Sequence, residues 1–260
     1  MVEGAGAWRI ERSGNVVFAG VGRGLTWFGS STPPPTSPAP ARPAPGLARH
    51  PAWQVALGWD GPVRISTGPR GAPLAAPACL IPPGLPRGPD DDSTRILIWI
   101  DPQLVAGLPL TAPTALDRRA ADRLRTAIGD GTPDADDLAA AVTDTLGRAP
   151  EIDPRLRHAL DGLGRAGSMA ELAEETGVST RRLRQLAATA VPTGLADLRR
   201  WHRLRHAGLR YPFQSAAEVA YDVGFADQAH LIRTSRALTG TTLAAVGAPV
   251  LSARRARGEG

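Results

Sequence analysis

The C-terminal third of the chain contains two stretches of the same design: SMAELAEETGVSTRRLRQLAA at residues 168–188 and SAAEVAYDVGFADQAHLIRTSRAL at residues 215–238. Each begins with an apolar helical pattern and passes through a Gly suited to a tight turn. Each then ends in a second helical pattern that carries Arg or Gln. This order predicts two helix-turn-helix units in tandem, and it makes double-stranded DNA the leading candidate partner.

In the first unit, Gly177 is suited to end the first helix because it can adopt a positive φ at little cost. Ser179 is expected to cap the second helix. Leu183 and Leu186 lie three residues apart in that helix, so they share a face that must turn toward the core. The outward face then carries three candidates for contacts with DNA bases: Arg181, Arg184 and Gln185.

The second unit repeats this arrangement. Gly224 is expected to end its first helix, Phe225 to fill the turn, and Asp227 to cap the second helix. Leu231 and Leu238 are predicted to face inward. The candidates for base contacts on the outer face are Gln228, His230 and Arg233.

Between the two units, one continuous amphipathic helix is predicted through Leu195, Leu198, Trp201 and Leu204. A single pair of Gly-terminated helices can mimic a helix-turn-helix, but two copies joined by such a helix favour the DNA-binding interpretation. His202 and His206 are expected to contact solvent or phosphate. The candidates for phosphate contacts on this bridging helix are Arg199, Arg200, Arg203 and Arg205.

These motifs resemble a known family. From residue 151 to residue 246 the chain is similar to the DNA-binding domain of the arabinose-operon regulator (AraC/XylS) family, most specifically in LAEETGVSTRRLRQL at 172–186 and VGFADQAHLIRT at 223–234. The resemblance implies that the two second helices enter successive major grooves and that the six outward side chains read bases. Independent chemistry agrees, because Arg pairs with guanine and Gln with adenine in the major groove.

The chain departs from the family at four positions. Ala187 and Ser235 stand where a core Phe is usual, Pro192 replaces a Gly, and Leu243 replaces a Pro. The loss of two aromatic side chains removes apolar area that stabilises each second helix, at about 25 cal/mol per Å². Either other aromatic residues compensate, or the domain is less stable than its relatives. The candidates for compensation are Trp201, Tyr211 and Phe213.

The net charge of +5 is concentrated in the C-terminal part of the chain. Residues 1–150 contain 14 Arg and 14 acidic residues, whereas residues 151–260 contain 16 Arg and 11 acidic residues. Such an excess is the electrostatic pattern expected of a domain that binds nucleic acid. Part of it lies in a basic tail at 249–260, which we expect to be disordered, with a DNA-contacting arm as the alternative.

The N-terminal half has a different pattern, with short β-rich segments separated by Gly and Pro. Strands are predicted at 7–12, 15–19, 25–28, 53–57, 62–66, 77–81 and 95–100, and hairpin turns at 20–24 and 59–61. Residues 32–46 contain seven Pro and are expected to form a loop. The runs at 50–65, 80–88 and 96–102 resemble, more faintly, the cupin-type domain that precedes the DNA-binding part in many members of the family.

The predicted fold is therefore α+β and multidomain. It comprises a degenerate cupin-like β-barrel for effector binding or dimerisation at 1–112, connecting helices at 113–150, an all-α tandem helix-turn-helix domain at 151–248, and the tail. Within the connecting part, helices are predicted at 115–128 and 135–146. Their apolar stripes are expected to pack on the barrel, with a dimer interface as the alternative.

Two other classes of function compete with a regulator. A cupin-type metalloenzyme needs several His and carboxylate ligands, but the N-terminal half contains only His50, so we predict no metal, cofactor or catalytic residue. A protein-interaction module with degenerate helix-turn-helix units is supported only by the missing core aromatics. The expected partners are double-stranded DNA, a small-molecule effector, a second copy of the chain and, if the protein is an activator, RNA polymerase.

The sequence also bears on location. The lone Cys79 excludes an intramolecular disulfide, which favours a reducing compartment, and it lies in an apolar run typical of a buried, inert thiol. No signal-peptide pattern or membrane-spanning run is present, so a cytoplasmic protein without a membrane partner is expected.

Overall fold

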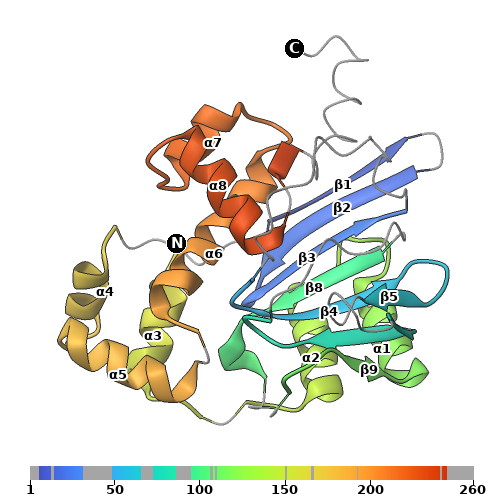
Figure 1. The fold of residues 1–260 in the computed structure, drawn as a ribbon, viewed down its shortest axis with the longest axis horizontal. Coiled ribbons are helices and arrows are strands. Elements are labelled where there is room, and N and C mark those ends of the chain that lie inside the picture. Colours follow the sequence, from blue (N-terminus) through green and yellow to red (C-terminus); the bar gives the residue numbers. More distant parts are fainter. Residues whose placement is uncertain are drawn as a thin grey trace.

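The computed structural model describes residues 6–12, 15–31, 49–65, 73–85, 95–105, 108, 110–149, 151–164, 167–191, 193–240 and 242–244. The Pro-rich segment at 32–46, Pro192 and the tail at 249–260 lie outside the described residues. The described part consists of a mainly antiparallel sheet with two helices on one face, followed by six helices (Figure 1).

Seven strands form one open antiparallel sheet. Its spatial order is β1 (Gly6–Arg12), β2 (Asn15–Gly22), β3 (Leu25–Ser30), β8 (Arg95–Ile100), β4 (Trp53–Gly58), β7 (Ala78–Ile81) and β9 (Thr114–Leu116). Within the described ranges, β1 and β9 are the two edges and do not pair with each other. The expected degenerate barrel is therefore an open sheet. In a closed barrel the inner face would be buried by closure, whereas here other elements cover both faces of the sheet.

One face of the sheet is covered by helices α1 (Arg118–Ile128) and α2 (Ala135–Leu146). Leu124 and Leu138, one from each helix, are fully buried in a core with the sheet residue Trp27. This confirms the prediction that the helical stripes pack on their own sheet. The predicted helix at 115–128 is wrong at its start, because Thr114–Leu116 pairs with β7 and Asp117 then caps α1 by accepting from the Ala120 N–H.

The opposite face of the sheet is also covered, in part by a separate two-stranded sheet of β5 (Val63–Ile65) and β6 (Leu74–Ala76). All six residues of β4 are buried, as expected for a strand covered on both faces. Cys79 of β7 belongs to the core of this layer and is fully buried, which confirms the prediction that its thiol is buried.

Of the two hairpin turns predicted in the N-terminal half, the structure confirms the one at 20–24 but not the one at 59–61. At 20–24, β2 extends to Gly22 and the turn is made by Arg23 and Gly24, which both have a positive φ (52° and 72°) as a two-residue hairpin turn requires. The chain also turns tightly at 59–61, since a Cβ on Gly58 would lie 1.7 Å from the Gly61 oxygen. The hairpin predicted there is wrong, because β5 pairs with β6, a strand the sequence pattern did not predict.

The C-terminal part contains six helices. They are α3 (Pro154–Gly162), α4 (Met169–Glu175), α5 (Thr180–Ala190), α6 (Leu195–Arg210), α7 (Ala216–Asp222) and α8 (Gln228–Thr239). Figure 1 shows α6 running from the α4–α5 pair to the α7–α8 pair, with the sheet beside it. We call α4–α5 the first unit, α7–α8 the second unit, and α6 the bridging helix.

The two units are built by the same local interactions. A capping box starts each first helix, between Ser168 and Glu171 in α4 and between Ser215 and Glu218 in α7. Nine residues after the capping Ser, each unit has a Gly with positive φ, 65° at 177 and 78° at 224. The next N–H bonds back to the carbonyl five residues earlier (Val178 to Ala173, 3.0 Å; Phe225 to Ala220, 2.8 Å), as in a Schellman turn.

The aromatic residues expected to compensate for the missing core Phe side chains differ in burial. Ala187 and Ser235 are both buried, at 3 % and 1 % exposure. Trp201 is buried in the core of the second unit, whereas Phe213 is 52 % exposed and contacts Trp8 of the sheet edge by an edge-to-face arrangement. Trp201 therefore fills core space, and Phe213 does not.

Candidate DNA interface

The first unit presents all three of its predicted base-reading residues to solvent. Arg181, Arg184 and Gln185 are exposed on α5, while Leu183 on the opposite side is fully buried. Ser179 caps this helix by accepting from the Arg182 N–H, which fixes where the exposed face begins. This part of the chain is therefore a protruding helix with a basic and amide-bearing face, suitable for entry into a major groove.

The second unit is similar, with one difference. Gln228 and Arg233 are exposed on α8, but His230 is only half-exposed and packs edge-on against Phe225, with ring centroids 5.2 Å apart. Asp227 caps α8 by accepting from the His230 N–H at 2.6 Å, as predicted. The imidazole of His230 is thus held against the turn, whereas the other two side chains extend from the helix.

Alignment of the two helices by their capping residues reveals two further basic residues. Arg182, three residues after Ser179, corresponds to His230, three residues after Asp227. Arg182 is exposed, and so is Arg236 on the second half of α8. Neither residue was among the base-contact candidates predicted from the sequence. Arg182 could have been included, because it directly follows Arg181 and lies three residues after the predicted cap Ser179.

Three of the four Arg side chains predicted to contact phosphate also make interactions within the protein. Arg199 donates to the Gly167 carbonyl just before α4, and Arg203 donates to the Gly224 carbonyl in the second turn at 2.8 Å. Partial burial, together with nearby Arg199, lowers the pKa of Arg203. Arg200 is the most exposed of the three and pairs with Asp197 at 2.6 Å. The bridging helix is thus bonded to both units by its own Arg side chains.

The structure does not support Arg205 as a phosphate contact or His202 as a surface residue. Arg205 is 4 % exposed and His202 is 2 % exposed, because α6 packs against the sheet at this point. Both face Asp101, which follows strand β8 and was not selected from the sequence. His206, the other histidine of α6, is half-buried.

Asp101, His202 and Arg205 form one buried cluster. Asp101 Oδ2 accepts from Arg205 Nη1 at 3.0 Å and lies 3.2 Å from His202 Nε2, while Arg205 Nη2 lies 3.0 Å from His202 Nδ1. Burial by itself raises the pKa of Asp101, but the charge and hydrogen bonds of Arg205 and His202 outweigh it and lower this pKa to about 2. Asp101 is therefore a carboxylate at neutral pH.

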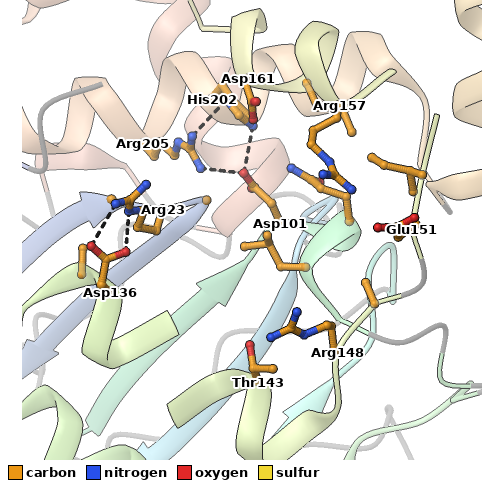
Figure 2. A pocket seen from close by; sticks show the side chains of 18 of the residues that line it. Arg23, Asp101, Asp136, Thr143, Arg148, Glu151, Arg157, Asp161, His202 and Arg205 are labelled. Atoms are coloured by element: carbon orange, nitrogen blue, oxygen red, sulfur yellow. Dashed lines mark hydrogen bonds and ion pairs between the residues drawn. The ribbon is translucent and has the colours of Figure 1, made fainter. Parts of the chain in front are cut away.

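The cluster lies in the wall of a cleft of about 910 Å³ between the sheet part and helices α3 and α6 (Figure 2). Figure 2 shows the ion pair of Arg23 and Asp136 on one side and Arg157 of α3 on the other. A second cleft of about 480 Å³ is lined by Trp53, Leu108 and Leu186, among others, and lies between the sheet part and α5. Leu186, Thr189 and Ala190 of α5 line the second cleft, whereas the first cleft is lined from the C-terminal part by α3 and α6 and the residues just before α3.

The described ranges of the chain contain no group of three or more His, Cys, Asp or Glu residues placed to hold a metal ion. No described helix combines the length and apolar character needed to cross a membrane.

Comparisons with known proteins give a family and several structural likenesses. A family model described as a helix-turn-helix domain matches residues 172–247, which include both turns. No curated protein matches the sequence. Similar solved structures include ToxT from Vibrio cholerae, at 9 % identity and a TM-score of 0.47 over 92 % of this chain and 95 % of that one.

Two further solved structures are similar over shorter stretches. A DNA-binding transcriptional dual regulator from Escherichia coli K-12 has 17 % identity and a TM-score of 0.34, over 40 % of this chain and 98 % of that one. The transcriptional regulator CdpR from Pseudomonas aeruginosa has 22 % identity and a TM-score of 0.30, over 58 % of this chain and 44 % of that one.

The family match falls on the part of the chain in which two capped helix pairs, two Gly turns and two exposed second helices have been described. Residues 172–247 are a helix-turn-helix domain of the AraC/XylS type, and the resemblance inferred from the motifs is confirmed.

Proposed function

We propose that this protein is a sequence-specific DNA-binding transcription regulator. The observation that carries the proposal is the pair of matched units, each of which presents a solvent-exposed second helix with Arg and Gln on its outer face. The match to the helix-turn-helix family over these same residues supports it. Such helices enter the major groove and place side chains against base edges.

In this proposal, the two units read successive major-groove segments on one face of the duplex. Arg181, Arg184 and Arg233 are suited to guanine, and Gln185 and Gln228 to adenine, because their forked donors and acceptors match those base edges. His230 is held against Phe225 and reads a base at the start of α8. Phosphate contacts come from Arg199, Arg200 and Arg203, which fix the position of the protein without reading sequence. Arg205 is omitted because it is buried.

The N-terminal part supplies regulation in this proposal. The 910 Å³ cleft is large enough for a small molecule, and its walls come both from the sheet part and from helices α3 and α6. A ligand in it would contact both parts at once, which is how an effector can change DNA binding. The exposed Arg and Gln residues of α5 and α8 argue against a module that binds proteins only.

Further elements of the proposal concern partners and place. We infer a non-enzymatic, cytoplasmic regulator that acts as a homodimer and, as an activator, contacts RNA polymerase. Sedimentation of the purified chain tests the dimer, and transcription in vitro with and without the protein distinguishes activation from repression.

The test of the central proposal is selection of DNA from a random duplex pool with the full-length protein, followed by gel-shift titration. We expect a preferred sequence that spans two adjacent major-groove segments, and an affinity that falls steeply with salt as Arg side chains displace counterions. Arg184→Ala with Arg233→Ala is the matched variant and should lose the preference. A chain that enriches no sequence, or binds without salt dependence, contradicts the proposal.

A further inference from the structure

The bridging helix contacts three parts of the molecule: the first unit, the second unit and the sheet part. Leu195 and Leu198, at its start, belong to the core of the first unit. Trp201, Leu204 and Ala207, further along, belong to the core of the second unit. His202 and Arg205 lie just past the junction of these two cores, and both are bonded to the sheet part through Asp101. The sheet therefore holds the bridging helix close to the point where the two units diverge.

Asp101 is well suited to hold a helix in position because its own backbone is fixed. Its N–H donates to the Gly24 carbonyl at 2.9 Å, and its carbonyl accepts from the Leu104 N–H at 2.9 Å. It follows the last residue of β8, a strand paired on both sides, and it precedes Pro102, whose ring restricts the chain further. The carboxylate thus projects from a rigid sheet end onto a helix of the DNA-binding part.

The three side chains of Asp101, His202 and Arg205 contact one another pairwise. A guanidinium can only donate, so His202 Nδ1 must accept from Arg205, and the imidazole proton is on Nε2, which faces Asp101. Removal of the Asp101 charge takes a carboxylate partner at 3.0 Å away from the buried guanidinium of Arg205, which is costly.

We propose that Asp101 is a positioning residue for DNA binding: through Arg205 and His202 it sets the orientation of the bridging helix, and thereby the spacing between the two recognition helices. The idea rests on the proposed function. The sheet does not cover the outer faces of α5 and α8, since Arg181, Arg184 and Arg233 are exposed, so its influence is on orientation and not on access. The cluster also lines the 910 Å³ cleft, so a ligand there would touch this contact directly.

A simple structural ion pair would predict the same loss on every DNA, so the test compares two duplexes. The first is the selected duplex with both groove segments. The second has the segment of the first unit scrambled, defined as the base pairs at which Arg184→Ala loses its preference. For full-length Asp101→Asn we expect a loss of about 10-fold on the intact duplex. On the scrambled duplex we expect a change within about 2-fold, since only one unit is then engaged.

A spacing readout separates positioning from general weakening. One base pair inserted between the two segments turns one relative to the other by about 34°. The wild-type protein should lose affinity on this duplex, and Asp101→Asn should lose less, because its units are no longer held at one spacing. The matched control is Asp136→Asn, which also lines the cleft but pairs with the exposed Arg23 of the β2–β3 turn. It should behave as the wild type.

Equal losses of Asp101→Asn on both duplexes, or none on either, would overturn the positioning role while leaving the regulator function intact. A wild-type protein that selects no sequence fails the proposed function itself, so the two failures are distinguishable. If Asp101→Asn does not fold, Arg205→Lys is tested in its place. It keeps the charge but lacks the planar fork by which Arg205 bonds Asp101 and His202 through two separate nitrogens, and it should show the same difference between duplexes.

Discussion

The two helix-turn-helix units share their local pattern and differ in what surrounds them. The buried core of the first unit consists entirely of residues from 156 onward, such as Leu160 and Leu183. The core of the second unit includes Ala52 and packs against Trp99, which both belong to the N-terminal part. The backbone N–H of Arg49 also donates to the Ala237 carbonyl of α8. The second unit is docked on the sheet, whereas the first unit borders the 480 Å³ cleft through α5.

This difference shows how two similar motifs can take different roles. The second unit shares core contacts with the N-terminal part, whereas the buried core of the first unit is shared with α3 and the start of α6. An effector in the 480 Å³ cleft would contact α5 directly, whereas one in the 910 Å³ cleft would contact α3 and α6. Coupling between an effector site and DNA needs such an element with more than one arrangement.

Among tests of this difference between the two units, Trp201→Ala is expected to have the largest effect. Trp201 is 2 % exposed, and its ring lies 5.6 Å from that of Trp99, so its removal leaves a cavity where α6, the second unit and the sheet meet. We expect a loss of about 3–5 kcal/mol in the free energy of unfolding, measured by urea denaturation. Phe213→Ala, at a 52 % exposed position, is the control and should change it by less than about 1 kcal/mol. Similar losses for both variants would show that the second unit is not docked as described.

Acid should weaken the contact between the sheet and the bridging helix. The pKa of Asp101 is lowered to about 2 in the folded protein, so its ionisation stabilises the fold above the ordinary Asp pKa of 3.8. That contribution is lost as the pH falls from about 4 to about 2, and it amounts to roughly 2 kcal/mol. The stability advantage of the wild type over Asp101→Asn should shrink across this window. An advantage that is constant from pH 5 to pH 2 would contradict the pairing.

The recognition surfaces should respond differently from the bridging helix. Arg184→Ala is expected to cost about 1–3 kcal/mol on the selected duplex, with a relaxed preference at one or two base pairs and little loss on random DNA. Arg200→Ala should instead weaken both DNAs alike and make the salt slope shallower by roughly one unit. Filter-binding titrations at several salt concentrations provide both quantities. Indistinguishable losses for the two variants would refute the assignment of base and phosphate contacts.

The smallest effects compare the two turns. Gly177 and Gly224 both have a positive φ, so Ala at either position costs about 1–2 kcal/mol from backbone strain. A Cβ at 177 meets no atom within 4 Å, whereas a Cβ at 224 lies 3.2 Å from Arg203 Cζ. Gly224→Ala should therefore lower the melting temperature more than Gly177→Ala. A larger decrease in melting temperature for Gly177→Ala than for Gly224→Ala would show that Arg203 does not pack against the second turn.

The helix-turn-helix units could be predicted from the sequence because they depend on neighbours. A cap, a Gly turn and an inward Leu act within about four residues, so Ser179, Gly177 and Leu183 could be placed by counting along the chain. The same reasoning placed the exposed candidates Arg184 and Arg233. Their role in reading bases stays a prediction, as do the boundaries of the four expected domains.

Prediction from local spacing failed where the residues that surround a side chain come from distant parts of the sequence. The amphipathic pattern of α6 identified a helix, but it did not show that the face with His202 and Arg205 lies against the sheet. Similarly, the apolar residues at 114–116 fit a helix start as well as they fit a strand, and only pairing with β7 decided between them. Local propensity is a weak guide when a partner elsewhere offers hydrogen bonds and burial.

The sequence by itself therefore determined the two motifs, their caps, their turns and the outward side chains of α5 and α8, because interactions between close neighbours specify all of these. Only the tertiary structure decided that the strands form an open sheet, that the second unit docks on it, and that Asp101 meets Arg205, 104 residues away. A buried charge is stable only beside its partner, and which residues become partners depends on how the sheet and the bridging helix pack.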